Sequence, residues 1–552
     1  MALPGCAKQN NDPKEVTPTD TTPTQTAADP NKPRDGGTFT VGTFTDIVKV
    51  SPLFYDDTSS GDIVYLTMAQ LYDVSPKGDI EVTERSIAAE LPKVSADGLV
   101  WTIKLKSTPK WSDGSPLTAE DVAFTFSTIA NKDAASPNYP YFASVKEAKA
   151  LDPTTVQITL KEVDARFELN TMTINPVPAK VYKGIKPEEM DKQAFGTDPK
   201  QTLYSGPYIW TEWVEKQYIK VVRNPNYWGK KPNIETIIVK VYADQTTEIQ
   251  ALMKGEIDYV SAIPVAQLDA VKGDKKINIV EGPGVSYDYV GYNFKPENWP
   301  GGFVPFAGAK TRQAIAYAVN RKGMIDAVLR GHGVQLNGPF LPGSWTDTPG
   351  AAFNYPYDSA KAKALLAEDG WKPGSDGILV KDGRKFEFEL LTNSGNNRRE
   401  SYAAIIQQNL AEVGIKVNIK PVEFATLIDQ YMDVGKYQAL LLGWQLGLEP
   451  DAESIFSSEY FVPAGQNYGY YKNTKTDKLW KDGYANTDKK KRQQIYAEIC
   501  KEFNNDPPYM FIAQQNGIMG HNVRVHYAKE NGPIPALPYG YFFHIFDWWV
   551  TD

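Results

Sequence analysis

The sequence predicts an α/β protein with two or three domains. Its 552 residues are too many for one hydrophobic core. Short runs with the composition of β-strands alternate with helical patterns, which is typical of α/β architecture. Just past the middle, the aromatic run 287–294 predicts a buried strand, and the apolar face of 310–329 predicts one helix that Gly331 ends. We expect these two segments to form the crossing between two lobes, with a ligand held beside the strand.

The first half of the chain supplies the elements of one lobe. Strands are predicted at 38–44, 99–106, 154–160, 208–210, 217–222, 234–242 and 257–260. Helices are predicted at 62–72, 118–129 and 246–254. The segment Thr118-Ala119-Glu120-Asp121 places a hydroxyl and two carboxylates at a helix start, where they complement the free N–H groups and the helix dipole.

The same alternation continues after the central segment. Helices are predicted at 359–369, 399–413 and 424–434, and strands at 386–392, 415–419 and 437–444. The C-terminal stretch 521–550 is rich in aromatic residues. We expect it to pack back on the first lobe.

Composition excludes several classes of protein. A net charge of −8 without a basic run argues against a nucleic-acid partner, because phosphate binding needs clustered Lys and Arg. Two cysteines, Cys6 and Cys500, are too few for a disulfide-stapled fold. No run of 18 apolar residues could span a bilayer.

Catalytic and metal-binding patterns are poorly supported. The four histidines lack metal-ligand spacing, and no phosphate-binding glycine loop or serine elbow stands between a strand and a helix. We therefore expect no metal, no cofactor and no enzymatic activity. Acid pairs such as Asp56 with Asp57, or Glu449 with Asp451, leave a hydrolase as an alternative, since sequence does not fix the separation of two carboxylates.

A binding chemistry remains. Asn393-Ser394-Gly395-Asn396-Asn397-Arg398-Arg399 opens a predicted helix. Arg399 could pair bidentately with a ligand carboxylate, helped by the helix N-terminus. An exposed helix cap with solvated arginines is an equal alternative. The residues alone leave these two interpretations open.

The N-terminal segment resembles a membrane anchor. Leu3-Pro4-Gly5-Cys6 is similar to the end of a bacterial lipoprotein signal, in which the cysteine is lipidated. Residues 7–37 are rich in Pro, Thr, Asp, Asn and Lys and nearly devoid of apolar residues, so burial cannot offset the entropy of ordering them. We expect Cys6 to carry a lipid and residues 1–35 to form a disordered tether.

Several sequence blocks together resemble a known family. They are Trp101-Thr102-Ile103-Lys104-Leu105-Lys106, Trp111-Ser112-Asp113-Gly114, Ser205-Gly206-Pro207-Tyr208, Arg223-Asn224-Pro225-Asn226-Tyr227-Trp228, Gly255-Glu256-Ile257-Asp258, Tyr292-Asn293-Phe294 and Thr311-Arg312-Gln313-Ala314-Ile315. Over residues 36–550 the chain resembles the peptide-binding (oligopeptide, dipeptide and nickel) family of extracellular solute-binding proteins of ABC importers.

The resemblance implies a two-lobed periplasmic-binding-protein (Venus flytrap) type II fold, with an extra domain inserted in the first lobe. The implied boundaries are 1–35 for the tether, 36–53, 200–288 and 517–552 for lobe I, 54–199 for the extra domain, and 289–516 for lobe II. The lobes of such proteins close over the ligand. We expect a monomer.

The function implied by the resemblance is that of a lipid-anchored receptor on the outer face of the cytoplasmic membrane. It would capture oligopeptides mainly through their main chains and deliver them to an ABC permease. The alternative that we retain is an oligosaccharide receptor of the same fold, which would bind cello- or xylo-oligomers.

One position departs from the family pattern. Many peptide-binding relatives carry an Asp shortly after the Gly-Trp that matches Gly443-Trp444, and that Asp pairs with the ligand's α-ammonium. This chain has Gln445-Leu446-Gly447-Leu448 there, so that contact is in doubt. The candidate ligand-binding residues are Tyr289, Tyr292, Asn293, Asn393, Asn396, Arg399, Gly443, Trp444, Gln445 and Tyr468.

Overall fold

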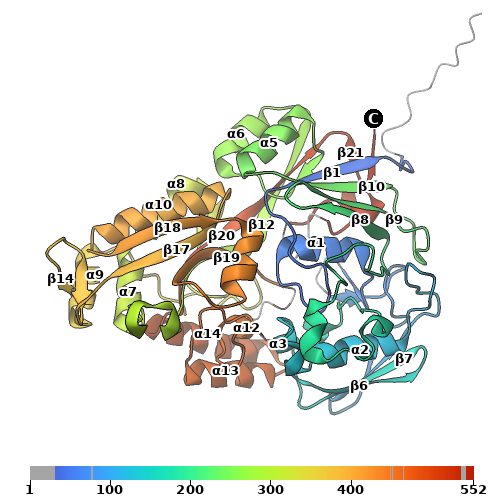
Figure 1. Ribbon diagram of the computed structural model, residues 1–552, viewed down its shortest axis with the longest axis horizontal. Helices are drawn as coiled ribbons and strands as arrows, with labels where there is room; N and C mark the ends of the chain where they lie inside the picture. Colours follow the sequence, from blue (N-terminus) through green and yellow to red (C-terminus); the bar gives the residue numbers. More distant parts are fainter. Residues whose placement is uncertain are drawn as a thin grey trace, which may run out of the picture.

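A computed structural model describes residues 32–551, except 76–78, 448, 450–451, 464 and 536–541. The lipidation predicted at Cys6 and most of the predicted tether lie outside the described residues. Within them, the chain forms two lobes with mixed helices and strands, which confirms the α/β prediction (Figure 1).

Two long strands join the lobes. They are β12 (Ile277–Tyr292) and β20 (Tyr509–Asn522), which pair antiparallel from Ile277↔Asn522 to Gly291↔Tyr509. The main sheet runs continuously through them in the order β18-β17-β19-β12-β20-β11-β1-β10-β9-β8. The predicted crossing strand is therefore present, and it begins ten residues earlier than expected. The pairing is irregular between Pro283 and Tyr287, near the middle of β12.

The first lobe is built on parallel strands at the centre of its sheet. β1 (Thr38–Thr43) pairs in parallel with β10 (Thr236–Val241) and with β11 (Tyr259–Val260). The other elements are β8 (Tyr208–Val214), β9 (Tyr218–Arg223), α1 (Thr58–Thr67), α5 (Gln245–Lys254) and α6 (Val265–Lys272). The C-terminal residues Phe546 and Trp548 are buried in this lobe's core, which confirms the predicted return of the chain.

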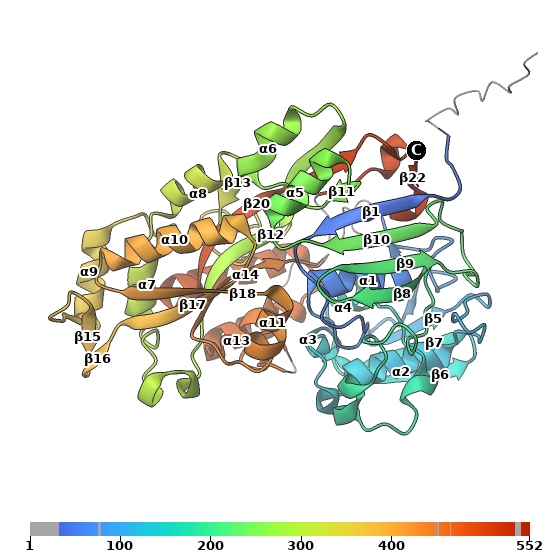
Figure 2. The ribbon, with the colours of Figure 1, turned by 45° about the horizontal axis from the view of Figure 1, so that its top comes forward.

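A smaller four-stranded sheet lies below the first lobe in the order β4-β5-β7-β6 (Figure 2). Its strands are β4 (Lys93–Val94), β5 (Val100–Lys104), β6 (Val145–Asp152) and β7 (Thr155–Leu160), and helix α2 (Ala119–Ile129) packs on β6 and β7. At the start of α2, the Asp121 carboxylate accepts a 2.9 Å hydrogen bond from the N–H of Thr118. One continuous apolar core extends from this region into the first lobe.

The second lobe places helices around a parallel three-stranded sheet, β17 (Glu387–Asn393), β18 (Lys416–Val422) and β19 (Ala439–Gln445). Its helices include α9 (Ser359–Glu368), α10 (Asn397–Ala411), α11 (Phe424–Leu427), α12 (Glu453–Phe456), α13 (Thr474–Tyr484) and α14 (Lys489–Asn505). The helix predicted at 424–434 is shorter than expected, because α11 passes into a π-turn at Ile428–Met432.

The single helix predicted over 310–329 is wrong. The structure contains two helices there, α7 (Ala309–Ala318) and α8 (Arg321–Leu329). Asn320 separates them, because its side-chain oxygen accepts the N–H of Gly323 at 3.0 Å and so begins a new helix. Its own N–H donates to Asn409 on α10 at 2.9 Å, which holds the break in place. Helix α1 likewise begins four residues before the prediction, at a cap formed by Asp57.

We predict that Gly206→Ala destabilises the first lobe. A Cβ atom at Gly206 would lie 2.5 Å from the carbonyl carbon of Thr67 at the end of α1, so backbone must move to accommodate it. Overpacking of this kind costs about 1–3 kcal/mol of unfolding free energy. Gly447→Ala is the control, because a Cβ there meets nothing within 4 Å. Denaturant unfolding of both variants tests this; equal midpoints would contradict it.

Candidate functional site

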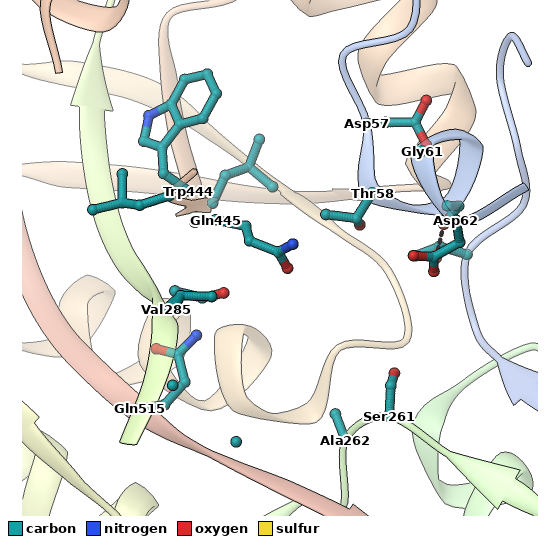
Figure 3. Close-up of a pocket in the computed structure, with 18 of the residues that line it drawn as sticks. Asp57, Thr58, Gly61, Asp62, Ser261, Ala262, Val285, Trp444, Gln445 and Gln515 are labelled. Carbon is teal, nitrogen blue, oxygen red and sulfur yellow. Dashed lines mark hydrogen bonds between the residues drawn. The ribbon is translucent and has the colours of Figure 1, made fainter. Parts of the chain in front are cut away.

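A cavity of about 770 Å³ lies between the lobes. Figure 3 shows side chains from both lobes around it, with Asp57 and Asp62 on one side and Trp444 on the other. The amides of Gln445 and Gln515 point into the space between them. Val285 and Gln515 belong to the crossing strands, so the wall includes both lobes and the connection between them. Its volume is in the range of ligand-binding sites.

The structure brings most of the predicted site residues to this cavity. Its walls include Tyr289, Asn393, Asn396, Arg399, Gly443, Trp444, Gln445 and Tyr468.

Two predicted residues, Tyr292 and Asn293, do not line the cavity. Successive side chains of a strand point to opposite faces, so Tyr292 projects away from Tyr289. The Tyr292 ring packs on Phe306 in the core of the second lobe, with centroids 4.6 Å apart. The Asn293 amide is used within the fold, where it donates to the carbonyl of Gly435 and accepts the N–H of Lys295. Their roles are structural.

A charged cluster on β12 and α10 forms part of the wall. Asp288 is fully buried and accepts hydrogen bonds from Arg398 Nε at 2.6 Å and from Arg399 Nε at 3.0 Å. Burial alone would raise the pKa of Asp288, but the two guanidinium groups lower it overall. Because two cations share one carboxylate, this wall carries an excess positive charge. The alternative of an exposed cap with solvated arginines is therefore wrong.

The start of α10 explains this geometry. Asn396 caps the helix by accepting the N–H of Arg399 at 3.0 Å, which places both arginines in the first turn. Asn393 accepts a 2.8 Å hydrogen bond from Arg399 Nη1 and fixes the guanidinium from the other side. Arg398 was not predicted as a site residue. The Asn396 cap, which is visible in the sequence, places it at the cavity wall beside Arg399.

Aromatic rings form a row along the second-lobe wall. Trp444 stacks nearly parallel to Tyr289, with centroids 6.3 Å apart, and to Tyr468, with centroids 5.9 Å apart. The Tyr468 hydroxyl donates a hydrogen bond to Asp56, which belongs to the segment before α1. Burial raises the pKa of Asp56. This hydrogen bond crosses from the second lobe to the first.

Other contacts between the lobes show that this is a closed conformation. The N–H of Asn397 donates to Gln245 on α5 at 3.1 Å. On the other side of the cavity, Arg166 pairs with Glu453 at 2.9 Å, and both side chains are buried. The cavity is therefore enclosed by contacts from both lobes.

Two acids that the sequence did not single out as ligand groups line the first-lobe wall. Glu248 is 2% exposed and Asp57 is 6% exposed. Within the described residues, Glu248 Oε2 and Asp57 Oδ2 have no hydrogen-bond partner. Burial raises the pKa of Glu248 to about 8 and is the main cause that raises the pKa of Asp57 to about 7. Glu248 carries no sequence signal, because its position depends on tertiary packing.

The acid that follows the position of the family's usual Asp lines the cavity and already has a cationic partner. Glu449 is buried and accepts a 2.5 Å hydrogen bond from Arg492 on α14. Asp451 lies outside the described residues. Across the part of the chain that the structure describes, there is no group of three or more metal-ligating side chains. That same part contains no helix with both the length and the apolar character needed to cross a bilayer.

We predict that Glu248 makes stability depend on pH. Its carboxyl holds a proton in the folded protein up to a pKa of about 8, whereas the unfolded chain releases it near the ordinary value of 4.5. The free energy of unfolding therefore falls as pH rises between these values. Glu248→Gln removes this cost, so its melting temperature should exceed that of the wild type at pH 8 and the difference should shrink by pH 5.

Calorimetry across that range measures the effect. Glu256→Gln removes the same charge from an exposed position beyond the end of α5 and should show no such trend. A pH-independent difference between Glu248→Gln and the wild type would contradict the prediction.

Comparison with known proteins agrees with this architecture. The model of the bacterial extracellular solute-binding proteins, family 5 (middle), matches residues 84–467. The oligopeptide-binding protein AppA of Bacillus subtilis is 31% identical over 535 residues, covering 94% of this chain and 93% of AppA. The probable D,D-dipeptide-binding periplasmic protein DdpA of Escherichia coli is 28% identical over 492 residues, covering 88% and 90%.

A solved structure supports the same relationship. AppA from Bacillus subtilis in complex with a nonapeptide superposes with a TM-score of 0.87 at 30% identity, covering 94% of this chain and 100% of that one. The predicted two-lobed type II fold is thereby confirmed, and so is the prediction of a binding protein in place of an enzyme. The chain belongs to family 5 of the bacterial extracellular solute-binding proteins, the substrate-binding components of ABC transporters.

Proposed function

We propose that this protein captures oligopeptides in the cavity between its lobes and delivers them to an ABC permease. The observation that carries the proposal is that one cavity wall is cationic and the other holds carboxyl groups that can ionise when a cation binds. The second-lobe wall has the excess positive charge of Arg398 and Arg399, and the first-lobe wall has the carboxyls of Asp57 and Glu248. A peptide brings an ammonium and a carboxylate, whereas neutral cello- or xylo-oligomers bring neither.

The crossing strand supports main-chain recognition. The pairing of β12 with β20 is interrupted between Pro283 and Tyr287, and Gly284, Val285 and Ser286 line the cavity there. Extended peptides can bind beside irregular strand segments of this kind. The carbonyl of Gly284 already accepts the side-chain amide of Gln514 at 2.8 Å, and that of Val285 accepts the N–H of Leu446 at 2.9 Å, so these two carbonyls belong to the fold. AppA, a relative of nearly the same length, has been solved in complex with a nonapeptide, which supports an oligopeptide as the ligand.

We also propose that Cys6 is lipidated and that residues 1–35 tether the receptor to the outer face of the membrane. The proposal rests on Leu3-Pro4-Gly5-Cys6 and the composition of the segment after it. Membrane fractionation of the full chain and of a Cys6→Ala variant tests it. Equal release of both proteins would overturn the anchor.

The ligand is identified by denaturing the purified protein and analysing what it releases by mass spectrometry. We expect peptides, and we expect titration calorimetry to detect binding of peptides of two to nine residues but not of cello- or xylo-oligomers. Small-angle scattering should show a smaller radius of gyration with bound peptide, because closure is a hinge motion. Binding of a sugar alone would replace the peptide assignment, and cleavage of incubated peptides would favour a hydrolase.

We predict that Arg399 binds a carboxylate of the peptide, with Arg398 beside it. Arg399→Gln should weaken binding of peptides with a free C-terminal carboxylate by about tenfold or more, because hydrogen bonds to charged groups contribute about 1.5–3 kcal/mol. The same peptides with a C-terminal amide should lose much less. Asp288 keeps Arg398 as its partner in this variant, so the fold is retained.

Titration calorimetry measures both affinities. Arg384→Gln is the matched control, since it removes the same charge from an exposed position in the second lobe outside the cavity wall. Equal losses for acid and amide peptides in Arg399→Gln would contradict a carboxylate site at this residue.

A further inference from the structure

Glu248 is a buried acid that the fold itself does not use. It lies in the first turn of α5 and lines the cavity, with 2% of its surface exposed. Within the described part of the chain, no hydrogen bond or ion pair involves its carboxyl group, and its Oε2 is fully enclosed. Buried polar groups are almost always hydrogen-bonded in folded proteins. An unsatisfied carboxyl in a ligand cavity therefore points to a partner supplied by the ligand.

The surrounding packing makes room for this carboxyl. A Cβ atom at position 42 would lie 2.9 Å from Glu248 Cγ and 2.5 Å from Ile257 Cδ1, so only glycine fits there. Helix α5 also packs into an apolar core that includes Ile249 and Leu252. These contacts hold Glu248 in place without neutralising it.

Charge on the same wall favours a cation. The cavity lining that precedes β12 contains no Lys, Arg or His among its described residues, but it contains Asp56, Asp57 and Asp62 as well as Glu248. Asp57 also has one oxygen without a hydrogen-bond partner in the described residues. Burial causes the raised pKa of Glu248. Among the described residues, Tyr242 is one titratable group whose pKa the charge of Glu248 raises.

We propose that Glu248 forms a subsite for an ammonium group of the peptide, supplied by its amino terminus or by a lysine side chain. This proposal rests on the proposed function and deepens it. It would make the receptor prefer peptides with a positive charge at that subsite. In many relatives an Asp shortly after the residue that matches Trp444 pairs with the ligand's α-ammonium, and this chain lacks that Asp. Glu248 would make the corresponding contact from the first lobe.

Binding at this subsite should release a proton. In the empty cavity at pH 7 the carboxyl of Glu248 is mostly protonated, because its pKa is about 8. A ligand ammonium that enters the subsite keeps its three hydrogens. Its positive charge favours the ionised form of the Glu248 carboxyl. The Glu248 O–H bond therefore breaks, the carboxylate accepts a hydrogen bond from the ammonium, and the proton passes to the buffer.

Affinity measurements on matched peptides test the subsite. The probes are alanine hexapeptides with lysine at one position, the same peptides with norleucine there, and N-acetylated forms of both. We expect a free amine at the preferred position to improve binding about tenfold in the wild type. In Glu248→Gln that ratio should fall to about one. Glu256→Gln is the charge-matched control and should keep the wild-type ratio.

The two sources of the ammonium separate in this series. If acetylation removes the preference, the amino terminus occupies the subsite; if the change of lysine to norleucine removes it, a side chain does. Either result supports the proposal. A ratio that persists in Glu248→Gln overturns it and leaves peptide capture intact. If none of the peptides binds the wild type, the proposed function itself fails, and the subsite fails with it.

Proton release gives a second readout that needs no variant. Titration of the wild type at pH 7 in phosphate and in Tris buffer, which differ in ionisation enthalpy, should show release of nearly one proton with the preferred amine peptide. The acetylated norleucine peptide should release essentially none. Equal proton counts for the two peptides would overturn the proposal even if Glu248→Gln failed to fold.

Discussion

The antiparallel pairing of β12 with β20 is the constraint on which both lobes depend. Each strand begins in one lobe and ends in the other, so a single ladder of hydrogen bonds belongs to both. The register of the ladder shifts at two places, between Pro283 and Tyr287 and between Asp288 and Tyr289. The first of these lies at the cavity wall, where Gly284, Val285 and Ser286 line the cavity. A hinge motion of the lobes would act through the same two strands.

The two walls of the cavity differ in their ionisable groups. On the second lobe, Asp288 neutralises only one of its two arginine partners, Arg398 and Arg399. On the first lobe, the described residues include no cationic partner of Glu248 or Asp57, and burial is the main cause that raises the pKa of Glu248 to about 8 and that of Asp57 to about 7. The first wall can therefore become charged when a cation arrives, and the second wall is charged beforehand. This difference is a physical basis for binding a peptide in one direction.

Sequence patterns predicted the elements and most of the cavity wall, because strand periodicity, helix caps and family blocks are local. The break at Asn320 was missed because the apolar spacing on both sides of it continues as if one helix were present. Tyr292 was assigned to the site by its neighbourhood, although strand alternation directs it into the core. Glu248 was not predicted, since the space for its buried side chain depends on Gly42, more than 200 positions away in sequence. The positions of these residues depend on tertiary packing, which local sequence patterns do not reveal.

Closure has a cost that the ligand can offset. The hydrogen bond from Tyr468 to Asp56 forms only when the lobes meet, and it brings Asp56 near Asp433 of the second lobe. Burial, and then the charge of Asp56, raise the pKa of Asp433 to about 8. Closing the empty protein thus buries two acids that repel each other when ionised. A ligand cation on the first-lobe wall reduces that repulsion. Since a ligand shifts a conformational equilibrium only through its difference in affinity for the two states, a peptide favours the closed form only through contacts that the open form does not offer.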